Sequence, residues 1–481
     1  MQPLYETIGE LEKKSYAVMR MGVLALSSGC GGYGVKDFMK TVAAFLGIEN
    51  QAHVTLTEIS STCRFKGYTL TRVHDISTVG VNVDRIYELE KLAYRIKDNK
   101  ELPIYGIKKD KPLIEEKIVK LPLFRKIRKN HNQTVSENNN YNDERLDWLN
   151  RQLDKIEVRP ILYDSPLIGV LTAMACAGIS LIIGLNVPAA ICAFIGGAFG
   201  QTLRWYMSKK YINQFAGIGA SVVLAGVVYI LSSNIISFLM PGVVVAMSGY
   251  VASMIFIIPG FPMLTGALDL AKLDFSSGVE RILYAITVLL VAGFAVWVVA
   301  GVTGFVPVQP IDMASPEALQ ILFFTIASFF GTIGFAFLFG CPVFLAFVCG
   351  ILGALANVIY FTEIRYINLP QAAAALFAAL ITGVISNYFS VKRHIPRLAF
   401  SVSIAVIMVP GAALYNTLYY INIKDINMGI FWLFQVTTVL CAVALGLVLA
   451  HVLTDREWTF DNDKVKPSGE IVEIVSEPKN H

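Results

Sequence analysis

The chain between Pro166 and Leu453 is a nearly continuous series of apolar stretches with short polar breaks. A helix needs about 20 apolar residues to cross a bilayer, and lipid offers no partners for an open backbone. We therefore expect a polytopic α-helical membrane protein with about ten transmembrane helices. They cover roughly Pro166–Ile183, Pro188–Trp205, Phe215–Ile235, Pro241–Leu268, Ile282–Gly304, Glu317–Leu338, Pro342–Phe361, Gln371–Phe389, Leu398–Tyr420 and Gly429–Leu453.

The first 160 residues are polar and charged, which divides the chain into a soluble head and a membrane body. We predict a cytoplasmic α/β domain over 1–100, a polar linker over 101–142, an amphipathic pre-membrane helix over 143–162, membrane repeats over 163–304 and 317–456, and a cytoplasmic tail over 457–481. Met1–Lys14 carries three glutamates and lacks a long apolar core, so it does not resemble a cleavable signal peptide.

Apolar periodicity gives the expected elements of the head. Helices are predicted over Tyr5–Ser28, Val35–Leu46 and Val83–Asn99, and strands over His53–Ile59 and Tyr68–Val73. A further helix over Asp143–Ile156 carries an apolar stripe formed by Leu146, Leu149, Leu153 and Ile156. This helix is expected to lie along the head or along the membrane surface.

The basic residues of the short loops predict the orientation. If the head is inside the cell, the outer loops hold only Arg365 and Lys424. The inner loops then hold Arg204, Lys209, Lys210, Lys272, Arg281, Lys392, Arg393 and Arg397. Both termini are therefore expected in the cytoplasm, with the body in the plasma (inner) membrane.

An internal repeat relates the fourth and ninth apolar stretches. Pro259-Gly260, Asp274 and Gly278 recur at one constant offset as Pro410-Gly411, Asp425 and Gly429. The third stretch also resembles the eighth, where Leu224–Val228 matches Ile381–Ile385. Two halves of five helices each must enter the membrane in opposite directions, which is the inverted-repeat design of many secondary transporters.

The two Pro-Gly pairs are the best candidates for a substrate site. Proline removes a backbone hydrogen bond within a helix, and the freed groups must find other partners in the membrane. Breaks at equivalent places in two inverted halves favour a shared binding site. The alternative is a pair of proline kinks that only shape packing.

The chain resembles the threonine/serine exporter family over nearly its whole length. In the head the resemblance rests on Ser28–Asp37, Phe45-Leu46-Gly47, the strand His53–Thr57, and Thr71-Arg72-Val73; in the membrane it rests on Pro259-Gly260-Phe261-Pro262, Asp269, Gly278, Arg281 and Pro410-Gly411. The resemblance implies export of small amino acids, with protons as the coupling ion. Some relatives are split into two proteins that resemble dicarboxylate (succinate) exporters, which leaves dicarboxylates as an alternative cargo. Unlike many members, this chain is glycine-rich over Gly29–Val35.

Polar residues within the apolar stretches complete the candidate site. The substrate-binding candidates are Pro259, Gly260, Pro262, Thr265, Pro410, Gly411, Tyr415 and Asn416. Asp269, Arg281 and Asn387 are the candidates for coupling or gating. Hydrogen bonding between helices is the alternative role for such residues, and an ion pair with Arg281 or a helix cap is the alternative for Asp269.

A third hypothesis belongs to another class of function. Gly29–Gly34 fits the pattern G-x-G-x-x-G, which would make the head a nucleotide-binding sensor or enzyme if Val23–Leu26 were a strand. A glycine corner between two helices is the favoured interpretation. No catalytic constellation, Walker A sequence, metal-ligand spacing or basic patch for nucleic acid is present in the sequence, so we predict a transporter rather than an enzyme, with no cofactor or metal. The expected partners are the small-molecule substrate, protons and membrane lipid, and the head is a candidate for homo-oligomerisation or gating.

Overall fold

The computed structural model describes residues 2–76, 80–98, 144–184, 186–246, 248–303, 317–393 and 425–455, with single positions between 397 and 420. The predicted linker over 101–142, the tail over 457–481 and most of the ninth apolar stretch lie outside the described residues. Seven described helices are long and apolar enough to cross a membrane. The chain is thus a multi-pass membrane protein.

Residues 2–98 form three helices and a three-stranded antiparallel sheet of order β1-β2-β3. The helices are α1 (Gln2–Ser27), α2 (Gly32–Phe45) and α3 (Val83–Asp98), and the strands are β1 (Glu49–Val54), β2 (Glu58–Phe65) and β3 (Tyr68–Asp75). The turn between β2 and β3 consists of Lys66 and Gly67, both at positive φ (49° and 84°), as tight hairpins require.

The strand predicted over His53–Ile59 is wrong. Those residues span the turn between β1 and β2, where the Thr55 hydroxyl accepts a hydrogen bond from the backbone N–H of Glu58 at 3.1 Å. The prediction merged the end of β1 with the start of β2. Strand β1 was not recognised as a separate strand because its residues, Glu49–Val54, are mostly polar and only its last residue is buried. Pairing with β2 rather than an apolar pattern defines it.

Helix α5 (Glu144–Glu157) lies along the head. Its apolar stripe is buried, and Arg20 of α1 donates to Asp154 at 2.7 Å and to Glu157 at 2.5 Å. Arg159, just beyond α5, forms an ion pair with the buried Asp84 at 2.5 Å. The connection from the head to the first membrane helix is thus fixed by ion pairs as well as apolar packing.

Where the structure describes it, the membrane body follows the predicted succession of helices except at the fourth stretch; the ninth stretch is described only at single positions. Its long helices are α6 (Leu167–Gly184), α7 (Val187–Lys209), α8 (Gln214–Leu239), α11 (Phe275–Thr303), α12 (Glu317–Leu338), α13 (Val343–Tyr366), α14 (Gln371–Arg393) and α17 (Ile426–Thr454). Between α8 and α11 the chain forms three short pieces instead of one span. These are α9 (Ser248–Ala252), the 3-10 helix η2 (Ile255–Ile257) and α10 (Gly260–Ala271).

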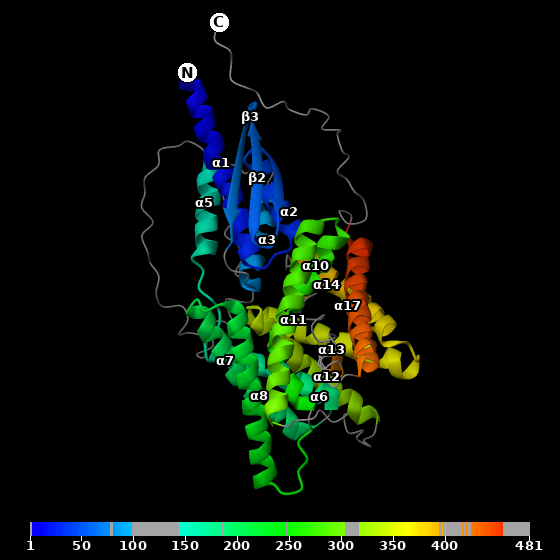
Figure 1. Cartoon of the computed structure of the whole chain (residues 1–481). Helices are drawn as coiled ribbons and strands as arrows, with labels where there is room; N and C mark the ends of the chain where they lie inside the picture. Colours follow the sequence, from blue (N-terminus) through cyan, green and yellow to red (C-terminus); the bar gives the residue numbers. More distant parts are fainter. Residues whose placement is uncertain are drawn as a thin grey trace.

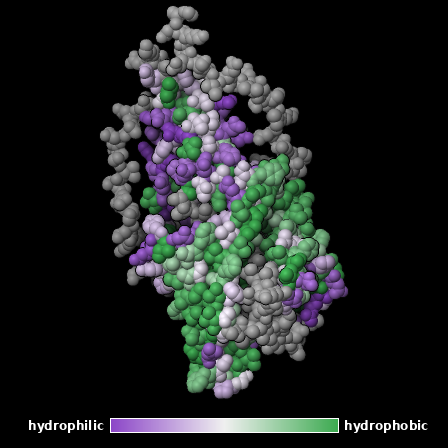
Figure 2. Space-filling view, viewed as in Figure 1, coloured by the Kyte–Doolittle hydropathy of each residue, from purple (hydrophilic) through white to green (hydrophobic). Residues whose placement is uncertain are grey.

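The head lies at one end of the membrane body (Figure 1). Its mostly hydrophilic surface gives way to a hydrophobic surface over the membrane helices (Figure 2). The C-terminal end of α10 and the N-terminal part of α11 face the head. The Gly32 N–H at the start of α2 donates to Asp269 of α10, and Arg281 of α11 donates to the carbonyl of Cys30. The broken segment therefore runs from the body to the head.

Candidate functional site

The break predicted at Pro259-Gly260 is present. Helix η2 ends at Ile257, and Pro259 precedes α10 with φ −80° and ψ 53°, outside helical geometry. The Gly260 N–H donates to the carbonyl of Ile258 at 2.8 Å, which closes a tight turn. Since Pro259 has no N–H, helical bonding cannot continue through this point. Helix α10 thus begins inside the protein.

At its other end, α10 presents a carboxylate to the head. Asp269 accepts hydrogen bonds from the backbone N–H groups of Gly32 at 2.9 Å and Tyr33 at 3.1 Å, and from the hydroxyl of Ser277 at 2.8 Å. The first N–H groups of a helix have no partner within the helix and carry partial positive charge. Asp269, which is distant in sequence, therefore caps the N-terminus of α2. Helix α2 has no side-chain cap from its own N-cap residue.

Arg281 of α11 completes this buried cluster. Its Nε lies 3.3 Å from a carboxylate oxygen of Asp269, and both side chains are 2% exposed. It also donates to the carbonyl of Cys30 at 2.8 Å and to the hydroxyl of Thr265 at 3.3 Å. This ion pair thus joins α10 and α11 to the glycine-rich segment of the head. We call the whole cluster (Gly29–Tyr33, Asp269, Ser277 and Arg281) the head latch.

The side chains of Asp269 and Ser277 lie too close to the backbone of the head latch for residues larger than glycine. A Cβ on Gly31 would lie 2.9 Å from a carboxylate oxygen of Asp269, and a Cβ on Gly32 would lie 2.5 Å from the hydroxyl oxygen of Ser277. Gly29 has φ +93°, which other residues rarely adopt. The segment is therefore a helix–turn–helix corner shaped for the membrane body.

The same geometry disfavours the nucleotide-binding interpretation of G-x-G-x-x-G. Val23–Leu26 lies within helix α1 rather than in a strand, and the amides of α2 that a phosphate would need bind Asp269.

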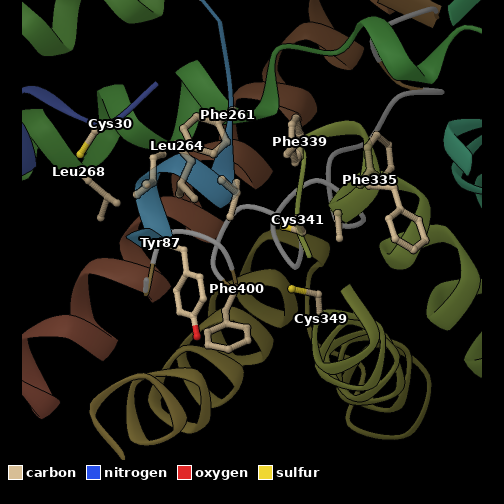
Figure 3. Close-up of a cluster of buried hydrophobic side chains, with 14 of the residues drawn as sticks. Cys30, Tyr87, Phe261, Leu264, Leu268, Phe335, Phe339, Cys341, Cys349 and Phe400 are labelled. Atoms are coloured by element: carbon tan, nitrogen blue, oxygen red, sulfur yellow. The ribbon is translucent and has the colours of Figure 1, made fainter. Parts of the chain in front are cut away.

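Cys30 of the head latch belongs to a cluster of buried apolar side chains (Figure 3). The rings of Phe261 in α10 and Phe339 after α12 are 5.6 Å apart, edge to face. The N–H of Val83, at the start of α3, donates to the carbonyl of Phe339 at 2.9 Å. Cys30 and Tyr87 of the head are buried in the same cluster. The head thus contacts both α10 and the turn between α12 and α13.

The other predicted site residues do not lie together in one site. Pro262 and Thr265 are buried in α10, and the Thr265 hydroxyl also donates to the carbonyl of Phe261. Asn387 of α14 donates to the Thr454 hydroxyl at 2.6 Å, which joins two helices. Asn416 is half-buried. Pro410, Gly411 and Tyr415 lie outside the described residues.

A second group of charges lies where α3 meets the membrane body. Burial raises the pKa of Glu90 to about 7, although the positive charge of Arg397 acts in the opposite direction. Arg397 itself forms an ion pair with Asp455, just after α17. The sequence analysis missed Glu90, because its burial depends on the docking of the head.

Comparisons with known proteins agree with this architecture. A family model for threonine/serine exporters matches residues 16–110 and 131–303, and a second threonine/serine exporter model matches 324–453. An uncharacterized protein of Haemophilus influenzae is 25% identical over 169 residues, which are 34% of this chain and 52% of that protein. The chain thus spans about half the length of this curated relative. No solved structure matches. Because the first model alone covers more than half of the chain, the chain belongs to the threonine/serine exporter family.

Proposed function

We propose that this protein exports threonine and serine by secondary active transport, with protons as the coupling ion. The observation that carries the proposal is the interrupted segment η2–α10, which begins inside the membrane body and ends on the head latch. Interrupted helices expose backbone groups that can bind a substrate. The start of α10 at Pro259-Gly260 carries the partial positive charge that attracts a carboxylate.

The head latch contains a candidate coupling device. Its only carboxylate is Asp269, which holds Arg281 and two amides of α2 through its negative charge. Protonation of Asp269 would weaken all of these interactions and loosen the head from α10. In this proposal, proton binding at Asp269 is linked to release of the head, and the head gates access to the substrate site from the cytoplasm.

Alternating access is proposed to occur between two five-helix halves of opposite orientation, in the inner membrane, with both termini in the cytoplasm. The repeat of Pro259-Gly260 as Pro410-Gly411 supports this arrangement. Single cysteines at Val308 and Lys392, tested with a membrane-impermeant thiol reagent in a variant lacking the native cysteines, should react from opposite sides. Labelling from the same side would contradict the proposed topology.

Transport by the purified full-length protein in vesicles tests the function. With an imposed pH gradient, labelled threonine and serine should accumulate, and a protonophore should abolish accumulation. Accumulation of succinate but not of threonine would favour the dicarboxylate alternative. That alternative comes from the two-protein relatives, which resemble dicarboxylate exporters. Transport of neither, with nucleotide binding measured by calorimetry, would favour a sensor.

A further inference from the structure

Arg204 of α7 is a partly buried cation that has no acidic partner among the described residues. Its Nη1 donates to the backbone carbonyl of Phe256 in η2 at 3.1 Å. Within the described part of the chain, no other hydrogen bond or ion pair holds its guanidinium. A guanidinium has five N–H donors, and burying one without an acid is costly. The remaining donors are thus available to a ligand beside the broken segment.

Gln201 lies one turn before Arg204 on the same helix. Its side chain is 6% exposed, and its amide oxygen has no hydrogen-bond partner among the described residues. A buried polar group without a partner is destabilising by about 1–3 kcal/mol, so such groups are rare unless they serve a ligand or a water molecule. Gln201 therefore carries unused hydrogen-bonding capacity one turn from a cation for which the described residues supply no acid.

The packing of α6 against α7 brings a third polar group to this place. A Cβ on Gly197 would lie 2.4 Å from the sulfur of Cys176, and a Cβ on Gly169 would lie 2.1 Å from the hydroxyl oxygen of Thr202. Because the two helices are consecutive and antiparallel, this register sets Thr172 opposite Gln201. Thr172 is fully buried, and its hydroxyl also has no hydrogen-bond partner in the part of the chain that the structure describes.

We propose that Arg204, Gln201 and Thr172 form the recognition site for a zwitterionic α-amino acid. Arg204 binds the α-carboxylate, which matches the fork of its N–H groups. The Gln201 amide oxygen accepts a hydrogen bond from the α-ammonium group, which has only donors. The Thr172 hydroxyl, which both donates and accepts, binds the side-chain hydroxyl of threonine or serine. A dicarboxylate has no ammonium group for Gln201.

This inference deepens the proposed function and rests on it, because it adds the chemistry of recognition beside the same broken segment. Arg204 contacts the carbonyl of Phe256, three residues before Pro259. Movement of η2 during transport would therefore act directly on the residue that holds the carboxylate.

Binding of labelled L-threonine to the purified full-length protein in detergent tests the site. Unlabelled 3-hydroxybutyrate, which lacks the ammonium group, and threonine methyl ester, which lacks the carboxylate charge, should each compete at least about tenfold more weakly than threonine, since a hydrogen bond to a charged group is lost. Either analogue competing as well as threonine would overturn the proposal. This part needs no variant, so it stands even if a substitution prevents folding.

Two substitutions test which residue binds the ammonium group of threonine and which binds its carboxylate. Gln201→Leu should weaken threonine binding about tenfold and leave competition by 3-hydroxybutyrate unchanged. Arg204→Gln should weaken threonine binding at least tenfold, whereas Lys209→Gln, at an exposed position on the same helix, should have no effect. If the wild type binds threonine and the Gln201 and Arg204 variants bind it equally well, the inference alone fails. If the wild type binds neither threonine nor serine, the proposed function fails with it.

Discussion

Replacing Asp269 with asparagine should release the head from the membrane body. The substitution keeps the shape of the side chain but leaves Arg281, 2% exposed, without a negative partner. Removing one member of a buried ion pair costs about 3–5 kcal/mol. The asparagine oxygen can retain one or two of the hydrogen bonds from Gly32, Tyr33 and Ser277, so we expect the lower limit, about 3 kcal/mol. That corresponds to roughly a hundredfold loss of the docked state.

Hydrogen exchange at the amides of Gly32 and Tyr33 measures this loss directly, because both amides bind Asp269 when the head is docked. Exchange in Asp269→Asn should be about a hundredfold faster than in the wild type. Asp274→Asn is the matched control. It removes a more exposed ion pair with Lys36 at 2.7 Å, where we expect about 1 kcal/mol or less. Unchanged protection in Asp269→Asn, or equal effects of the two variants, would refute the reasoning.

Two further predictions concern the head. Gly32→Ala should speed exchange at the amide of Tyr33, because the new Cβ would lie 2.5 Å from the Ser277 hydroxyl oxygen, whereas Gly9→Ala, with nothing within 4 Å, should not; equal effects would contradict the close-contact argument. The pKa of Glu90 is about 7 in the folded protein, against an ordinary value of 4.5. As pH rises, Glu90 therefore loses its proton in the unfolded chain before it does so in the folded protein, and the free energy of unfolding should fall between about pH 4.5 and 7. Thermal unfolding at pH 5 and pH 7.5 should show a smaller pH-dependent loss in Glu90→Gln than in the wild type; the same loss in both would exclude Glu90 as its source.

The membrane body was largely predictable because hydropathy and helix breaks are local properties. Apolar stretches of sufficient length mark the seven helices that can cross a membrane, and Pro259-Gly260 marks the interruption before α10. The repeat that relates this pair to Pro410-Gly411 remains a prediction, since the second pair lies outside the described residues.

The head latch was only half predictable. An ion pair between Asp269 and Arg281 was one of the expected alternatives because the two are close in sequence. The hydrogen bonds from the amides of Gly32 and Tyr33 to Asp269 were not predicted, because these residues lie more than 200 residues away from Asp269 in the chain. The glycines signalled a tight corner, but a sequence pattern cannot say what approaches it.

Gln201 and Arg204 were missed for a different reason. Arg204 was predicted to be one of the loop cations that set the orientation, and Gln201 was not among the predicted site residues. Two long polar side chains at positions i and i+3 share one helix face, and that spacing was a usable signal. That the described residues leave the Gln201 oxygen without a hydrogen bond and Arg204 without an acid is, however, a property of packing that only the structure reveals.

The most direct measurement is threonine transport by the variant in which both Pro259 and Gly260 are alanine. Vesicles with an imposed pH gradient would be compared for the wild type, this variant and Gly9→Ala. We predict that the double variant remains folded and monodisperse in detergent yet loses threonine and serine transport, while Gly9→Ala transports normally. Undiminished transport by the double variant would contradict the claim that the interrupted helix is the moving, substrate-bearing part of the protein.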